Sequence, residues 1–298
     1  TDPHRPFFAS QQLEAQKAKK NQKAGLRAGE GKITPFKQED ITVPSFLEDL
    51  PDVRREVAQY YSSVRRFDAS FGEVMKSLRA AGREADTAIV FLSDHGMSFP
   101  FSKATVYRNG TWVPVLVRWP GMGQPQRREE LVSSVDIVPT LLEVLKQPPL
   151  AGVDGRSWLP LLRGETRPGR DFVITHVNTV SSGKSFPQRC VRTKDFSYQF
   201  HAWPNGTPHF RVEAMNGITF GALSKAGESD ARIKSRVEQL TTGRPEQFFD
   251  LRTDPDERVN LIADARHTAE IARLKKLLLA HMEKTADPQL ENFRKVAK

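Results

Sequence analysis

Residues 87–96 read Thr-Ala-Ile-Val-Phe-Leu-Ser-Asp-His-Gly, and Lys103 follows seven residues later. The run from Thr87 to Leu92 is short, apolar and rich in β-branched residues, which is typical of a buried parallel strand. Open α/β sheets bind their ligands just beyond the carboxyl ends of such strands. Asp94 and His95 stand at that position, so the sequence predicts an α/β fold with a ligand site after this strand.

The polar residues of this stretch have the chemistry of a metal site beside an anion-binding cation. A carboxylate and an imidazole are both metal ligands, and Gly96 allows the backbone to turn sharply next to the bound group. Lys103 is a compact charge with three donors that can contact a phosphate- or sulfate-like oxygen. In the alternative interpretation Asp94 caps the next turn, His95 is a structural polar residue and Lys103 is solvated. Spacing alone leaves both interpretations open.

Four segments of the chain resemble the sulfatase family, and most closely its N-sulfoglucosamine sulfohydrolases (heparan N-sulfatases). Residues 93–107 resemble the second metal-ligand segment of that family, and residues 2–7 resemble its histidine-bearing loop. Residues 187–193 resemble the strand that opens the C-terminal subdomain. Residues 249–261 contain Phe-Asp-Leu, Asp-Pro, Glu and Asn-Leu in the order of the sulfatase tail signature. The four segments keep the family's order over nearly the whole chain.

The resemblance implies the C-terminal part of an alkaline-phosphatase-like sulfatase fold in residues 1–168, with a loop or insertion at 9–50. A small antiparallel β subdomain with a C-terminal helix would follow in residues 169–298. Local patterns agree with this division. They predict helices from Pro51 to Gly82, over 134–145 and through 271–282, and strands at 114–119, 172–177, 190–192 and 196–200.

The formylglycine motif of sulfatases, Cys/Ser-x-Pro-x-x-Arg, does not occur in the sequence. The single cysteine, Cys190, lacks a proline two residues later, and Ser98-Phe99-Pro100 is followed by Lys103 instead of arginine. The paired N-terminal aspartates of the family's metal site are missing as well. We therefore expect the chain to be a C-terminal fragment whose nucleophile lies in an N-terminal part.

The resemblance also implies roles for individual residues. Asp94 and His95 would be metal ligands, and Lys103 would be a catalytic cation that contacts the sulfate. His4 would be the acid that protonates the leaving group, or a hydrogen-bond donor to the sulfate. These roles suit sulfuryl transfer, because negative charge spreads over the sulfate oxygens and the leaving group needs a proton.

The substrate contacts and the metal are further expectations from the resemblance. Asp2 and His176 are candidates for substrate binding, although a histidine at the end of an apolar strand is as often structural. The implied cofactor is Ca²⁺, with formylglycine expected only in the missing part. Sulfamidases commonly carry asparagine where His95 stands, and imidazole is more usual on other metals, so Mg²⁺, Mn²⁺ or Zn²⁺ are possible.

The composition fits an enzyme with a polyanionic substrate. The net charge is +9 and the isoelectric point is near 9.7, which suits a polyanionic partner such as a sulfated carbohydrate and would equally suit nucleic acid. The family resemblance implies a sulfated carbohydrate, with N-sulfoglucosamine favoured. No nucleic-acid partner is expected, because the basic stretch at 17–32 has no interleaved aromatic residues for base stacking.

No apolar run approaches the ~20 residues that span a bilayer. By resemblance the protein would be periplasmic, secreted or lysosomal.

Two alternative functions stay open. The first is a metal-dependent phosphoesterase of the same superfamily, since Asp-His pairs occur there too. The second is a catalytically inactive glycan-binding fragment, since the nucleophile is missing. The sequence decides neither between N- and O-sulfate nor on the oligomeric state.

Overall fold

The computed structural model describes residues 33–120, 122, 124–165, 170–203 and 209–297. The predictions for Asp2 and His4 and for the first part of the 9–50 loop lie outside the described residues. The part of that loop from residue 33 is irregular except for a 3-10 turn, η2 (Gln38–Asp40). None of the helices in the described ranges is long and apolar enough to cross a membrane.

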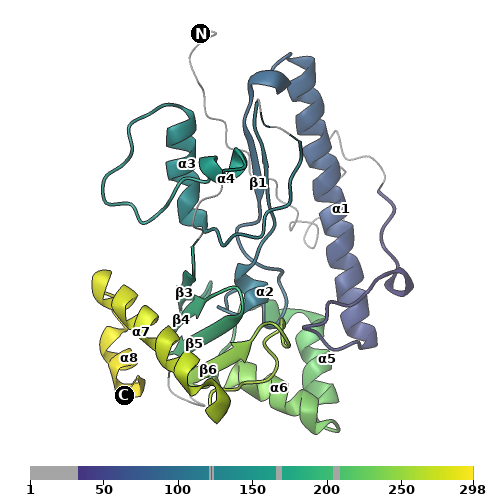
Figure 1. The fold of residues 1–298 in the computed structure, drawn as a ribbon. Coiled ribbons are helices and arrows are strands. Elements are labelled where there is room, and N and C mark those ends of the chain that lie inside the picture. The colour runs from purple at the N-terminus through teal and green to yellow at the C-terminus, as the bar shows by residue number, and fades with distance from the viewer. Residues whose placement is uncertain (1–32, 121, 123, 166–169, 204–208, 298) are drawn as a thin grey trace.

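The predicted long helix is confirmed as α1 (Pro51–Ala80), which has proline in its first turn. Proline suits that position because its missing N–H would have no partner there in any case. Gly82 follows with a φ of +67°, a conformation that ends the helix and favours glycine. α1 runs alongside β1 (Ile89–Leu92) in Figure 1. Phe67 and Phe71 of α1 both pack edge-on against Phe91 of that strand, at centroid distances of 5.5 and 5.3 Å.

The strand that precedes the predicted site is present, but the prediction that it is parallel and buried is wrong. β1 pairs antiparallel with β2 (Val115–Arg118) in a two-stranded ribbon, and all four of its residues are half-buried. An apolar composition predicts neither the direction of a strand nor which of its faces are covered. The chain turns back through residues 93–114, which makes β2 the partner of β1 within the part that the structure describes.

The predicted antiparallel sheet of the C-terminal part is confirmed and has four strands. They are β3 (Val173–Thr179), β4 (Ser185–Arg192), β5 (Phe196–His201) and β6 (Glu246–Asp250), in that spatial order. β6 had not been predicted. The mixed helix and sheet content agrees with the predicted α/β class.

The two faces of this sheet differ in chemistry. One face carries Val191, Tyr198 and Phe248, which form an apolar core with α7 (Thr268–Lys284) and α8 (Leu290–Val296). The opposite face of the sheet carries side chains that are polar yet fully buried. Among them are Gln199 of β5 and Gln247 of β6, which lie opposite each other in the strand register. This polar face is directed toward residues 104–111, as the contacts described below show.

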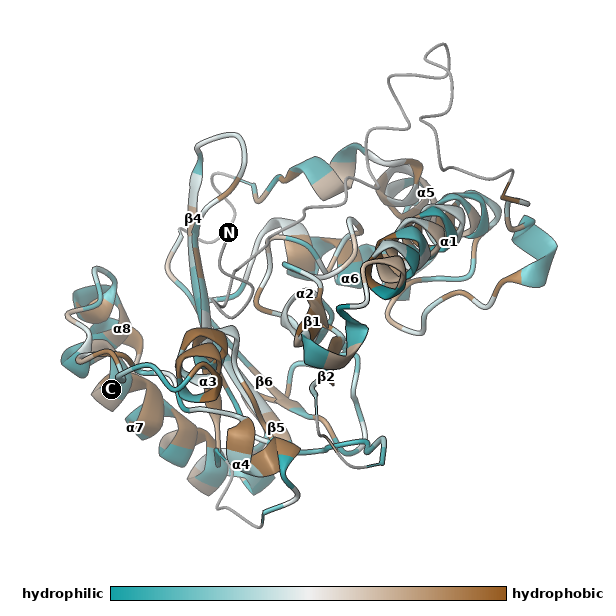
Figure 2. Cartoon of the chain, turned by 90° about the horizontal axis from the view of Figure 1, so that it is seen from above, coloured by the Kyte–Doolittle hydropathy of each residue, from teal (hydrophilic) through white to brown (hydrophobic). Residues whose placement is uncertain are grey.

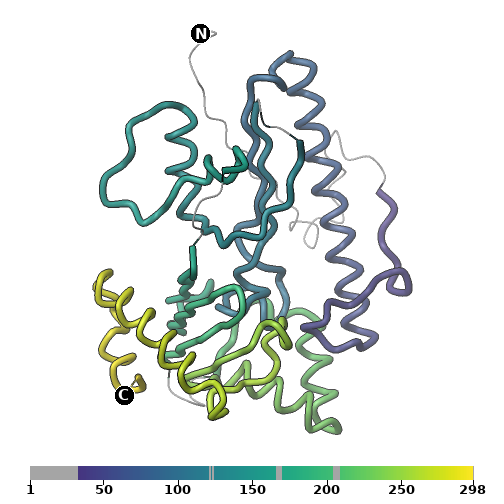
Figure 3. The backbone as a smooth tube through the Cα atoms, viewed as in Figure 1, coloured from purple at the N-terminus to yellow at the C-terminus, as the bar shows by residue number. Residues whose placement is uncertain are grey.

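The remaining helices are short. Figure 3 shows the chain leaving the β1–β2 pair, passing through α3 (Ile137–Val144) and continuing to the four-stranded sheet. In Figure 2, α3 is coloured as largely apolar. Their bounds are η3 (Glu84–Asp86), α2 (Arg108–Thr111), η4 (Ser134–Asp136), α3 (Ile137–Val144), α4 (Leu159–Leu162), η5 (Glu213–Asn216), α5 (Ile218–Ala226), α6 (Ala231–Thr241) and η6 (Ala265–His267). A second buried core joins residues 41–107 to residues 180–249. The boundary at 168/169 stays a prediction.

Candidate functional site

Residues 93–111, here called the site loop, form a compact unit held by its own backbone. Gly96 N–H donates to the carbonyl of Gly110 at 3.0 Å, and the buried Ser102 hydroxyl donates to the carbonyl of Asn109 at 2.7 Å. The backbone passes so close at Gly96 that a Cβ there would lie 2.0 Å from the Asn109 carbonyl oxygen. Glycine is therefore required directly after the Asp94-His95 pair.

Asp94 and His95 form the donor pair at the start of this loop. The Asp94 side chain is 77% exposed and that of His95 is 33% exposed. Nδ1 of His95 lies 2.8 Å from the Gly96 carbonyl oxygen, which can only accept, so Nδ1 carries the proton. The other ring nitrogen, Nε2, lies 3.5 Å from Asp94 Oδ2.

This arrangement fits two ligand positions on one cation. A carboxylate oxygen and an imidazole nitrogen 3.5 Å apart can contact the same cation, and Ca²⁺ binds oxygens at about 2.3–2.6 Å. A carboxylate oxygen combined with an imidazole nitrogen also suits Mn²⁺ or Zn²⁺. No group of three or more potential ligand side chains occurs within the described ranges, so Asp94 and His95 would need further ligands to complete a coordination sphere.

Lys103, in the same loop, has a partner that the sequence did not predict. Its Nζ forms an ion pair with the carboxylate of Glu213 from η5, and its backbone N–H donates to the Met97 carbonyl at 3.0 Å. The Lys103 ammonium and the Ser181 hydroxyl lower the pKa of Glu213, as does the nearby His95. The structure therefore brings Lys103 and His95 into the vicinity of one carboxylate.

His176 lies in a different setting. It faces Arg189 across the β3–β4 pair, and the buried Arg189 forms a two-point ion pair with Asp287 at 2.6 and 2.9 Å. Desolvation and the Arg189 guanidinium lower the pKa of His176, and His281 of α7 is also close. These neighbours include neither Asp94 nor Lys103, and a substrate role for His176 stays a prediction.

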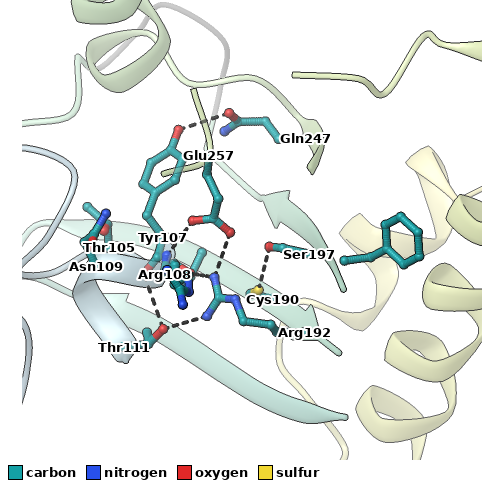
Figure 4. A network of polar contacts seen from close by, with 12 residues as sticks. Thr105, Tyr107, Arg108, Asn109, Thr111, Cys190, Arg192, Ser197, Gln247 and Glu257 are labelled. Carbon is teal, nitrogen blue, oxygen red and sulfur yellow. Dashed lines mark hydrogen bonds and ion pairs between the residues drawn. The ribbon is translucent and has the colours of Figure 1, made fainter. Parts of the chain in front are cut away.

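A buried ion pair fixes the second half of the site loop (Figure 4). Arg192 of β4 and Glu257 have side chains that are 8% and 0% exposed and lie 2.8 Å apart. Arg192 also donates to the Thr111 hydroxyl at 2.7 Å and to the Val106 carbonyl at 3.0 Å. The other Glu257 oxygen accepts from the backbone N–H of Arg108. The loop backbone is thus held by charges from two distant segments.

The remaining contacts to the loop come from the polar face of the sheet and from α6. Gln188 accepts from the Val106 N–H at 3.3 Å, and the buried Tyr107 hydroxyl donates to Gln247 at 3.0 Å. The guanidinium of Arg236 lies 3.6 Å from the ring centroid of Phe101, and desolvation lowers its pKa to about 10. The buried polar face therefore serves as the support of the site loop.

The residues that sequence reasoning missed here are Glu213, Arg192 and Glu257. The latter two fall inside segments that resemble family signatures, but the signatures do not say which residues touch. Glu213 carried no signal, since it follows an irregular stretch and lies 110 positions after its partner.

Two family models match the sequence. One, described as Sulfatase, matches residues 1–147, and the other, described as N-sulphoglucosamine sulphohydrolase, C-terminal, matches residues 94–205. The human N-sulphoglucosamine sulphohydrolase is 30% identical over 267 residues, which cover 84% of this chain and 52% of the human protein. The chain spans about half the length of the curated relatives it matches.

Solved structures with the same fold include a putative sulfatase from Bacteroides thetaiotaomicron. It is 21% identical, with a TM-score of 0.58 over 78% of this chain and 44% of that chain. A phosphonate monoester hydrolase from Silicibacter pomeroyi is 22% identical, with a TM-score of 0.57 over 80% of this chain and 42% of that chain. The likeness shows a fold that a sulfatase and a phosphonate hydrolase share. The two family models and the human relative show that the chain belongs to the sulfatase family.

Proposed function

We propose that this protein acts as a metal-dependent sulfatase on sulfated glycans, with the N-sulfate of glucosamine as the favoured group. The observation that carries the proposal is the site loop, which holds a carboxylate, an imidazole and an ammonium together in a chain of the sulfatase family. The human relative is named for its action on N-sulphoglucosamine. Family resemblance extends the proposal to a periplasmic, secreted or lysosomal location.

In this proposal each residue of the loop has a separate task. Asp94 and His95 hold the cation, which neutralises charge on the sulfate oxygens when it is bound. Lys103 donates to a sulfate oxygen, and its charge is worth more in the transition state because negative charge grows there. Hydrolysis of a sulfamate breaks the S–N bond, so the leaving nitrogen must gain a proton, and His4 is the proposed donor. The nucleophile is expected outside this sequence.

The test is activity of the complete protein on an N-sulfated glucosamine, an aryl sulfate and an aryl phosphate, with calcium and with zinc. We expect the sulfated substrates to be hydrolysed and Lys103→Ala to lower kcat about 10²-fold. Lys76→Ala is the matched control, because Lys76 lies on α1 and forms an exposed ion pair with Glu73. Preference for the phosphate would favour the phosphoesterase, and inactivity with retained glycan binding would favour a binding module.

Metal binding gives a readout that does not depend on turnover. Calorimetric titration with Ca²⁺ should show binding that Asp94→Asn weakens at least tenfold, because a charged ligand becomes neutral. His95→Asn should preserve Ca²⁺ binding, since asparagine supplies an oxygen ligand. Loss of all metal binding in His95→Asn would instead indicate a metal that requires nitrogen.

A further inference from the structure

Glu213 reaches the site loop from a distant segment of the chain. It is the first residue of η5, and its neighbours Val212, Ala214 and Met215 are 3–5% exposed and belong to a buried core. The Ser181 hydroxyl from the turn between β3 and β4 hydrogen bonds to the Glu213 carboxylate. The position of this carboxylate is therefore set by the core.

The partner of Glu213 is a side chain that needs such a fixed point. Lys103 carries its charge on a four-carbon stem with many rotamers. The Lys103 side chain is 19% exposed and that of Glu213 is 36% exposed, so the contact is shielded on the Lys103 side. An ammonium has three donors, and the ion pair with Glu213 leaves donors of Lys103 for an oxyanion.

We propose that Glu213 is a positioning residue that holds the Lys103 ammonium in the orientation that stabilises the transferring sulfuryl group, an inference that rests on the proposed sulfatase function. The carboxylate also keeps the net charge of the pair near zero. A neutral pair should attract the dianionic product sulfate less than an unpaired Lys103 ammonium would.

This role predicts a split between the kinetic constants. Glu213→Gln removes the counter-charge and keeps the shape, so kcat should fall between about 10- and 100-fold as Lys103 loses its orientation. KM for a sulfated substrate should stay unchanged or fall, and product inhibition by inorganic sulfate should strengthen, because the ground state then meets an uncompensated cation.

The experiment is a double-mutant cycle in the complete protein. Glu213→Gln should change kcat less than about twofold in the Lys103→Ala background, because a positioning residue acts only through its partner. Glu129→Gln is the control, since Glu129 forms an exposed pair with Arg127, and it should match the wild type. A rise in KM for Glu213→Gln, an unchanged kcat, or additive effects in the cycle would each overturn the proposal.

A second readout separates this inference from the proposed function. ¹⁵N relaxation of the Lys103 Nζ should show an ordered ammonium in the wild type and a mobile one in Glu213→Gln. If the wild type hydrolyses no sulfated substrate, the sulfatase proposal fails, and an ordered Lys103 would still support the positioning by Glu213. Equal mobility of Lys103 in both proteins would refute the positioning, whatever the activity.

Discussion

Replacing Glu257 by glutamine tests whether the site loop depends on a buried charge. One Glu257 oxygen accepts from Arg192 at 2.8 Å, and the other accepts from the backbone N–H of Arg108. Glutamine keeps one acceptor but turns the other oxygen into an NH₂ group, which cannot accept. The change therefore leaves the buried Arg192 guanidinium without its counter-charge, and in either orientation of the amide its NH₂ group faces an N–H donor.

The size of the effect follows from burial. Side-chain exposures of 0% and 8% leave almost no solvent to screen the loss. Breaking such a pair by removing one partner costs about 3–5 kcal/mol. At about 2.1 cal/mol/K per residue, a chain of 298 residues has an unfolding entropy of about 0.6 kcal/mol/K, so Tm should fall by about 5–8 °C.

The assay is thermal unfolding of Glu257→Gln at pH 7, followed by circular dichroism and calorimetry. Glu291→Gln is the matched control, because its pair with Arg294 is exposed at 75% and 46% and should contribute less than about 0.5 kcal/mol. The double variant Arg192→Met/Glu257→Gln should recover part of the loss, since no unpaired charge remains. A Tm for Glu257→Gln within 1 °C of the control would refute the reasoning.

Three further predictions concern pH and packing. Desolvation lowers the pKa of His201 to about 3, so the unfolded chain binds a proton first as the pH falls below 6.5. The protein should then lose about 2 kcal/mol between pH 6.5 and 5, and His201→Phe should remove this loss in urea unfolding. Gly96→Ala should cost about 1–3 kcal/mol and weaken Ca²⁺ binding, whereas Gly72→Ala, with open space around it, should do neither. Burial raises the pKa of Asp287, but hydrogen bonds from Arg189 and a backbone N–H outweigh it. The net pKa lies below 3.8, so Asp287→Asn should lower stability at pH 7 and flatten its fall below pH 4.

The sequence was sufficient for features that depend on near neighbours. The apolar spacing and the N-terminal proline located α1, and alternation together with turn residues located three of the four strands of the antiparallel sheet. Asp94 and His95 are adjacent in the chain, so one loop was enough to place them together.

The sequence did not predict the features that depend on the whole fold. The direction of β1 is decided by its pairing with β2, and an isolated strand composition does not encode that partner. β6 was missed because its mixed polar residues reflect a sheet with one apolar face and one polar buried face. Glu213 and Lys103 meet only because η5 packs into the same core as α1 and the loop, so no local pattern marks them as partners.

Residues 249–261, which resemble the sulfatase tail signature, have a structural role in this chain. Glu257 supplies the charge that fixes Arg192, and Arg192 in turn holds the Val106 carbonyl within the site loop. Asn260 satisfies the open edge of β6 by accepting from the Phe248 N–H at 3.0 Å and donating to the Glu246 carbonyl at 3.2 Å. An unpaired edge next to a buried ion pair would admit water and weaken the charge that orients the loop. The segment therefore supports the backbone of the site loop, and under the proposed function a substitution at Glu257 should reduce stability and metal affinity together.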